Sequence, residues 1–298
     1  MQVRHPGHPR HPSHRLHPRR LAEIHVYPLK GARGISLERA DVLAGGLRHD
    51  RRFMLLDAHG DFITQRQHPR LALVSTALLP AEDAPDGAPA RLAIATPGNE
   101  PLAMPVAPRE TQKRRTVRIW NDDVAAVEIA GPIVAALSEH LGERCTLVYM
   151  PEDVVRPVEA PYGAPRDRVG FADAYPVLLA AQASLAELNT RLKDAPVPMN
   201  RFRPNLVVEG GEPYAEDEYP RVRIGALTLR MPKRCSRCSV TTVDQETAAV
   251  GKEPLRTLAR YRAVDHHVYF AQNLIPDGLD GDQAIAVSVG DEVTYLVS

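Results

Sequence analysis

The chain has 298 residues, of which 44% are hydrophobic and 25% charged, as is ordinary for a globular protein with room for two domains. No apolar run approaches the roughly 18 residues of a membrane-spanning helix, so we expect no membrane contact. The formal net charge is +0, but residues 1–20 hold five arginines and no acid; the slightly acidic remainder excludes general nucleic-acid binding.

The first segment, residues 1–20, repeats histidine at every third position among prolines. Proline at this spacing blocks helix formation and favours extended polyproline II. A segment with so few apolar groups cannot offset its ordering entropy, so we predict a disordered tail and exclude it from the fold. A metal-binding tail is the alternative. The histidines concerned are His5, His8, His11, His14 and His17.

Residues 21–148 are predicted to form a mostly antiparallel β domain, because strand-like runs recur there at close spacing. On the run 62–66, Thr64 and Arg66 should share one face, since side chains alternate along a strand. One helix should begin at Pro132 and end at Gly142. The strand-like runs cover residues 21–29, 53–56, 62–66, 71–79, 117–120, 124–129 and 146–150.

Residues 149–298 are predicted to form the second domain, which begins with a proline-rich loop over 151–168. Ser184 and Glu187 have the spacing of a capping box at the start of a helix. Arg201 and Arg203 precede a strand and could together clamp a phosphate. The other expected elements are strands at 206–208 and 269–273, a helix at 254–262, and a closing hairpin formed by 285–289 and 293–297.

Two thiols, Cys235 and Cys238, lie between an alternating apolar run and a second β-prone run, 239–243. Lys233, Arg234 and Arg237 surround them, and nearby cations favour the thiolate, which attacks electrophiles or binds soft metals. The only other cysteine in the chain is Cys145. Three cysteines do not make a secreted disulfide framework, so we expect a reducing cytoplasm.

Three interpretations of the two thiols stay open on these residues alone. They could be buried core cysteines, although charged and hydroxyl neighbours are unusual there. They could be half of a zinc site, but structural zinc needs four ligands and no second close pair follows. Finally, one thiolate could ligate a redox metal or a cofactor, with the other thiol as its neighbour.

The remaining chemistry points to an anion. The chain has no glycine-rich phosphate loop of the known patterns and no nucleophile elbow of the Gly-x-Ser-x-Gly type. A buried cofactor with a phosphate, held by cations and reached by a thiolate, would use both the anion-binding side chains and the two thiols. The prominent anion-binding residues are Lys30, Arg51, Arg66, Arg201 and Arg203.

The order of motifs resembles the MOSC-domain proteins, specifically those with an N-terminal β-barrel domain, such as bacterial amidoxime and N-hydroxylaminopurine reductases. The resemblance implies an α+β, mostly β fold: a β-barrel-like N-terminal domain and a MOSC β-barrel domain with few helices, with the cofactor site between them. The motifs are Tyr27–Lys30, Asp50-Arg51, Ile63–Gln67, Phe171–Asp173, Ala183–Leu185, Phe202–Asn205, Cys235–Cys238 with Thr241–Asp244, Glu253–Leu255 and Tyr269–Asn273.

The resemblance implies molybdenum cofactor (molybdenum on molybdopterin) and reduction of N-hydroxylated small molecules, with electrons from a separate reductase because no cysteine follows Cys238. Cys238 is the expected molybdenum ligand and catalytic residue. Pyridoxal phosphate binding is a family-level expectation only. The alternative is a cofactor or persulfide carrier without redox catalysis. The residues expected to bind the cofactor are Lys30, Arg51, Thr64, Arg66, Asp173, Arg203, Asn205 and Thr241.

Two positions depart from the family pattern. Ala181-Gln182 stands where the family often has Ser-Glu, and Ala271 stands where it often has glycine. Both departures concern local contacts of the pocket and not the expected metal ligand.

Overall fold

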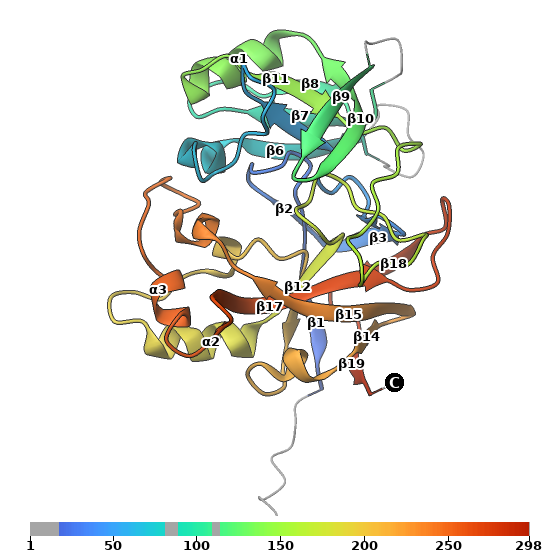
Figure 1. The fold of residues 1–298 in the computed structure, drawn as a ribbon, viewed down its shortest axis with the longest axis vertical. Coiled ribbons are helices and arrows are strands. Elements are labelled where there is room, and N and C mark those ends of the chain that lie inside the picture. Colours follow the sequence, from blue (N-terminus) through green and yellow to red (C-terminus); the bar gives the residue numbers. More distant parts are fainter. Residues whose placement is uncertain (1–17, 81–88, 109–113, 298) are drawn as a thin grey trace, which may run out of the picture.

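The structure is a computed structural model that describes residues 18–80, 89–108 and 114–297. It is mostly β with few helices, which confirms the predicted fold class. Figure 1 shows two lobes, with α1 and β6 to β11 in the upper one and most of the C-terminal strands in the lower one. The histidine-rich stretch of the predicted tail, residues 1–17, lies outside the described residues.

A nine-stranded sheet forms the lower lobe, and its strands run in the order β19-β14-β15-β17-β12-β13-β1-β2, with β16 beside β17. Its inward side chains, such as Leu179, Leu206 and Leu229, are fully buried in one apolar core. The strands are β1 (Arg20–Val26), β2 (Ile35–Leu37), β12 (Val177–Ala181), β13 (Leu206–Glu209), β14 (Arg221–Ile224), β15 (Leu227–Ser236), β16 (Ala263–Val264), β17 (His267–Pro276) and β19 (Val293–Leu296).

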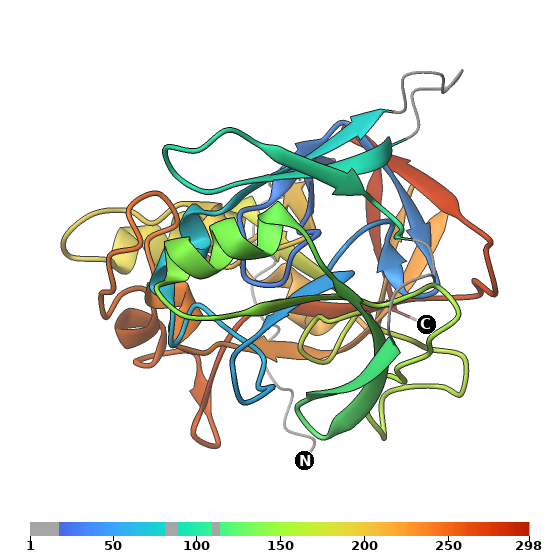
Figure 2. The ribbon, with the colours of Figure 1, turned by 90° about the horizontal axis from the view of Figure 1, so that it is seen from above.

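The N-terminal strands belong to the lower lobe although they come first in the chain. β1 pairs antiparallel with β13, and β3 (Arg39–Leu43) pairs with β18 (Ile285–Ser288) and β4 (Gly46–Leu47). In Figures 1 and 2 the blue N-terminal strands therefore lie beside the orange and red C-terminal ones. The segment between β1 and β5 thus runs from one lobe to the other, which brings Lys30 and Arg51 to the junction. The predicted domain border at residue 148 stays a prediction.

The upper lobe has two small sheets with α1 packed over them. Helix α1 (Pro132–Leu141) is confirmed, with proline in its first turn and Gly142 at φ 75° after its last residue. Its buried side chains, Ile133 and Leu137, face the core of this lobe. The sheets are β5-β11-β10-β9 and β6-β7-β8, formed by β5 (Phe53–Leu56), β6 (Ser75–Pro80), β7 (Pro89–Ala95), β8 (Leu102–Pro105), β9 (Arg114–Ile119), β10 (Asp122–Ile129) and β11 (Thr146–Tyr149).

The predicted strand over 62–66 is wrong. Only Phe62 makes a β-bridge, to Leu56, and the chain then turns over Gln65–Gln67. The Thr64 hydroxyl bonds to Gln67, and its oxygen accepts the Arg66 N–H at 3.1 Å, so local turn bonds replace the strand ladder. Thr64 and Arg66 therefore lie at a turn and not on one face of a strand.

Four predictions for the second half also differ from the structure. Helix α2 (Gln182–Arg191) begins before Ser184, whose hydroxyl donates to Glu216 at 2.7 Å instead of capping the helix. The run 239–243 is the short 3-10 helix η4 (Ser239–Thr242), and the helix expected at 254–262 shortens to α3 (Leu255–Leu258). The last two strands form no hairpin, because β18 pairs with β3 and β19 with β14.

Candidate functional site

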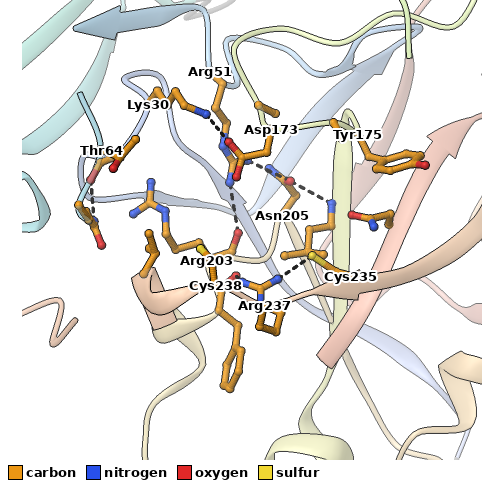
Figure 3. Close-up of a pocket in the computed structure, with 18 of the residues that line it drawn as sticks. Lys30, Arg51, Thr64, Asp173, Tyr175, Arg203, Asn205, Cys235, Arg237 and Cys238 are labelled. Atoms are coloured by element: carbon orange, nitrogen blue, oxygen red, sulfur yellow. Dashed lines mark hydrogen bonds and ion pairs between the residues drawn. The ribbon is translucent and has the colours of Figure 1, made fainter. Parts of the chain in front are cut away.

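The principal pocket lies at the junction of the two lobes and is shown in Figure 3. The upper lobe contributes the turn after β5, and the lower lobe contributes the ends of β15 and β17. The loops before β5, β12 and β13 complete the wall. The lining residues are Lys30, Gly31, Arg51, Thr64, Gln65, Arg66, Ala172, Asp173, Ala174, Tyr175, Leu178, Phe202, Arg203, Asn205, Cys235, Arg237, Cys238, Val240 and Asn273.

The two cysteines reach the pocket in different ways. Cys235 is on β15 where its register with β17 shifts, between the pairs Arg234–Gln272 and Ser236–Tyr269, and such a bulge re-aims a side chain. Cys238 lies after the strand and immediately before η4. Its carbonyl accepts the Thr241 hydroxyl at 3.0 Å, which fixes the backbone that carries the second thiol.

The cations around the thiols do not act as the sequence suggested. Burial raises the pKa of Cys235, and the charge and hydrogen bond of Arg237 only partly oppose this. Lys233 pairs with Glu159 at 2.5 Å, and the Arg234 guanidinium lies 4.7 Å from the ring centroid of Tyr269. The prediction that three cations favour the thiolate is therefore wrong for Cys235.

Two arginines of the pocket stack on one tyrosine. The guanidinium carbons of Arg51 and Arg203 lie 4.1 and 4.3 Å from the ring centroid of Tyr27. Asp50 accepts a hydrogen bond from Arg51 at 2.5 Å and another from the Tyr27 N–H at 2.8 Å. Burial lowers the pKa of Arg203 to about 10, so its guanidinium is still charged at neutral pH.

Asn205 joins Arg51 to the sheet. Its side-chain oxygen accepts bonds from Arg51 at 3.0 Å and from the Leu178 N–H at 3.1 Å, and its amide donates to the His25 carbonyl at 3.1 Å. The residue is 1% exposed. These three bonds hold Arg51 in a fixed position relative to β1 and β12.

Lys30 and Asp173, which line the same pocket, form an ion pair at 2.5 Å. Desolvation in the pocket raises the pKa of Asp173, but the charge and hydrogen bond of Lys30, and then the charge of Arg66, lower it to about 2. Burial lowers the pKa of Lys30, and Asp173 opposes that shift. Asp173 is therefore charged around neutral pH, and its carboxylate favours the charged form of Lys30.

The lining has a strong excess of positive charge. It contains five cationic side chains, from Lys30, Arg51, Arg66, Arg203 and Arg237, against the single carboxylate of Asp173. Within the described residues, Arg237 Nε is buried without a hydrogen-bond partner. Such a wall disfavours a cationic ligand and suits a large anion that also meets a soft sulfur.

Two family models match the chain. The model of the MOSC N-terminal beta barrel domain matches residues 19–144, and that of the MOSC domain matches residues 166–294. The chain belongs to the MOSC-domain family. The pocket of this MOSC protein lies where the segments covered by the two models meet, so residues of both contribute to one site.

The relatives of this MOSC protein have molybdenum- or amidoxime-related names. Mitochondrial amidoxime-reducing component 1 of Mus musculus is 33% identical, over 82% of this chain and 72% of the mouse protein. The protein of the same name from Homo sapiens is 31% identical, over 93% of this chain and 82% of the human protein. Molybdenum cofactor sulfurase of Oryza sativa subsp. japonica is 29% identical over 84% of this chain, which covers 32% of that protein.

The pocket of the MOSC protein brings together eight of the nine predicted site residues, and Thr241 is the exception. Thr241 is 1% exposed and lies behind Cys238, because its hydroxyl bonds to the Cys238 carbonyl. Arg201 does not join Arg203 in a clamp. Its Nε donates to the Thr241 carbonyl at 2.9 Å and its Nη2 to the Glu253 carbonyl at 3.0 Å.

Several contributors were not predicted from the sequence. In the sequence, Tyr27 stands out only as part of a motif, although the guanidinium groups of Arg51 and Arg203 both stack on its ring. The amide of Gln65 donates to Gln245 at 3.1 Å and receives a 2.9 Å bond from it, which joins the turn after β5 to the loop after η4. An amide pair far apart in the sequence leaves no spacing signal by which it could be found.

The described residues contain no group of three or more His, Cys, Asp or Glu side chains that could hold a metal ion, so the zinc interpretation has no support there. Cys145 lies in the upper lobe beside Ser138 and away from the two thiols of the pocket. None of the described helices is long and apolar enough to cross a membrane.

Proposed function

We propose that this MOSC protein holds molybdenum cofactor in the pocket between its lobes and reduces N-hydroxylated compounds such as amidoximes and hydroxylamines. The proposal rests on one observation: the soft sulfur of Cys238 and five cationic side chains line the same pocket. Thiolate suits molybdenum, and guanidinium forks suit the pterin phosphate. The names of the relatives agree with this chemistry.

The roles follow from the contacts. Cys238 would ligate the metal, since Cys235 is held by Arg237 and its burial favours the thiol. Arg51 and Arg203 would hold the anionic tail, because Tyr27 keeps their guanidinium planes in place before any ligand arrives. The remaining predicted contacts are Lys30, Thr64, Arg66, Asp173 and Asn205, and Thr241 would support Cys238 from behind.

The bound cofactor would supply the two-electron reduction of the N–O bond, and the chain supplies binding, orientation and charge. The described residues contain no cysteine group for an iron–sulfur cluster, so we include a separate reductase as electron donor in the proposal. We also retain the expectation of a reducing, cytoplasmic compartment, because all three cysteines are free. Pyridoxal phosphate is not part of the proposal.

The test is reconstitution with a matched cysteine control. Purified protein should contain molybdenum and pterin fluorescence, and with a reduced dye it should convert benzamidoxime to benzamidine. Cys238→Ser should lose both the metal and the activity, whereas Cys145→Ser, which changes a thiol outside the pocket, should keep them. Loaded wild-type protein that leaves both benzamidoxime and hydroxylamine unchanged would refute the reductase assignment.

A second function is favoured by the rice relative, whose name is molybdenum cofactor sulfurase. In this case Cys238 would carry a persulfide or hand on the cofactor without redox catalysis. Mass spectrometry of freshly isolated protein separates the two functions. A persulfide on Cys238 in protein without pterin would support the carrier, and bound cofactor with amidoxime turnover would support the reductase.

A further inference from the structure

Trp120, the only tryptophan of the chain, lies in the turn between β9 and β10. Ile119 pairs with Asp122, so Trp120 and Asn121 form a two-residue hairpin turn. The Trp120 side chain is 43% exposed. It is the largest side chain among the exposed hydrophobic residues that the structure describes, and a large aromatic group is costly to leave in water.

The backbone of Trp120 is unusual for its residue type. Its φ is 55°, in the left-handed region, at the first central position of the turn. Hairpin turns place glycine, asparagine or aspartate at positions with positive φ, because a bulky side chain is strained there. Local turn chemistry thus disfavours tryptophan, and the reason for its presence should lie in what the indole contacts.

The contacts of Trp120 lead to the rim of the pocket. The Arg66 guanidinium carbon lies 5.1 Å from its ring centroid, and the ring of Phe62 meets it edge-on, with 5.1 Å between centroids. After the charge and hydrogen bond of Lys30 and the charge of Arg66, the nearby indole also lowers the pKa of the Asp173 carboxyl. Arg66 and Asp173 both line the pocket. In Figure 3, Asp173 lies beside Lys30 at the end of the pocket away from Cys235.

Packing over Phe62 alone does not account for this arrangement. Phe62 and Arg66 contact the ring, while 43% of Trp120 stays open to solvent. The exposed part of an indole offers its π-face to a ligand. Planar groups stack on such faces, as bases do on the aromatic residues of binding grooves.

We propose that Trp120 is a specificity-determining residue of this MOSC protein, and that its exposed indole stacks on the aromatic group of a substrate whose N-hydroxylated end enters the pocket. The inference rests on the proposed function, which it deepens. It predicts a preference for planar aromatic or heteroaromatic N-hydroxylated compounds over small aliphatic ones with the same reacting group.

The first test needs no turnover. Because Trp120 is the only tryptophan, fluorescence excited at the red edge of its absorption reports on this one side chain. Benzamidoxime should quench or shift the emission saturably, whereas acetamidoxime, which has the same head group without the ring, should leave it unchanged. An emission that responds to neither compound, or equally to both, would overturn the proposal.

The second test compares substrates in cofactor-loaded variants with a reduced dye. Trp120→Leu should lower the ratio of kcat/KM for benzamidoxime to that for hydroxylamine about tenfold, mainly through the KM of benzamidoxime, since one stacking contact is worth about one decade. Trp120→Phe should retain most of the ratio. Asn121→Ala changes the same turn without removing an aromatic group and should keep the wild-type ratio.

The outcomes separate this inference from the proposed function. An unchanged ratio in Trp120→Leu, or the same loss in Asn121→Ala, would refute the stacking role while leaving the reductase assignment intact. If no form of the protein reduces hydroxylamine, the reductase assignment fails. In that case the fluorescence titration still decides whether Trp120 binds the aromatic ring.

Discussion

Arg237 donates a hydrogen bond from Nη1 to the sulfur of Cys235 at 2.9 Å. Its Nη2 donates to the Phe202 carbonyl at 2.7 Å, so the guanidinium is fixed between the strand end and the loop before β13. The two thiols of the motif are therefore not equivalent. Burial raises the pKa of Cys235, which Arg237 holds in place, so Cys238 is the thiol that we propose as the ligand for a soft metal.

This difference predicts unequal effects of the two serine substitutions. Cys235→Ser should keep most of the molybdenum, because a serine hydroxyl can still accept the hydrogen bond from Arg237. Its activity should fall about tenfold, a loss typical of substituting a residue that supports a metal ligand. Cys238→Ser should lose both the molybdenum and the activity. Metal analysis measures the molybdenum content, and dye-linked turnover measures the activity. Equal loss of metal in the two variants would contradict it and favour a site with two sulfur ligands.

Arg201 and Arg203 allow a matched pair of substitutions two residues apart. Arg203→Ala should lower cofactor content at least tenfold with little loss of stability, because Arg203 contributes to a repulsive pair of guanidiniums in the cofactor-free pocket. Arg201→Ala should instead lower the free energy of unfolding by about 2–4 kcal/mol, since it leaves the buried carbonyl of Thr241 and the partly buried carbonyl of Glu253 unpaired. Urea unfolding and pterin fluorescence check both expectations, and a reversed pattern would contradict them.

Ala271 marks the place where β17 carries the extra residue opposite Cys235. Its φ is 71°, in the left-handed region, and it is 1% exposed. Ala271→Gly should change the free energy of unfolding by less than about 1 kcal/mol, because relief of about 1–2 kcal/mol of strain is offset by the lost methyl burial and the flexibility of glycine.

Ala271→Val is the control for that position. A branched side chain in the left-handed region and in a closed core should lower the free energy of unfolding by more than about 2 kcal/mol. It should also disturb the bulge that aims Cys235, so cofactor content should fall with it. Thermal unfolding at equal protein concentration measures both variants. Similar stabilities for Gly and Val would show that the backbone at Ala271 is not strained.

The contents of the site could be predicted from the sequence, but its geometry could not. The order of the motifs identified Lys30, Arg51, Arg203 and Cys238, because each residue type fits one part of an anionic, sulfur-bound cofactor. No pattern in the sequence indicated that both arginines stack on Tyr27, because this contact depends on three loops that meet only after β1 pairs with β13.

Tertiary pairing overrode the local patterns at two places in the second half of the chain. The runs that follow Gln283 alternate like a hairpin, and a turn separates them, yet β18 and β19 join different sheets. Ser184 has the spacing of a helix cap, but a buried carboxyl, Glu216, takes its hydroxyl. In both cases a partner distant in the sequence gave a better hydrogen bond than the local one.

Glu216 itself predicts a pH dependence of stability. It is 0% exposed, and Oε2 is buried without a partner among the described residues. Burial raises the pKa of this carboxyl to about 6, and the bond from Ser184 only partly opposes the shift. Between the ordinary value of 4.5 and about 6, the folded state binds more protons than the unfolded one, so the free energy of unfolding falls as pH rises through this window.

The expected loss is about 2 kcal/mol, from a pKa difference of roughly one and a half units. Glu216→Gln removes this titration, so the difference in stability between wild type and variant should shift in favour of the variant from pH 4.5 to 6.5. Urea unfolding of both proteins at several pH values measures it, and the comparison cancels every other titrating group. Ser184→Ala, which removes the opposing bond, should increase the slope of the wild-type curve. Parallel curves for wild type and Glu216→Gln would mean that the carboxyl titrates normally and that water reaches Oε2 in the folded protein.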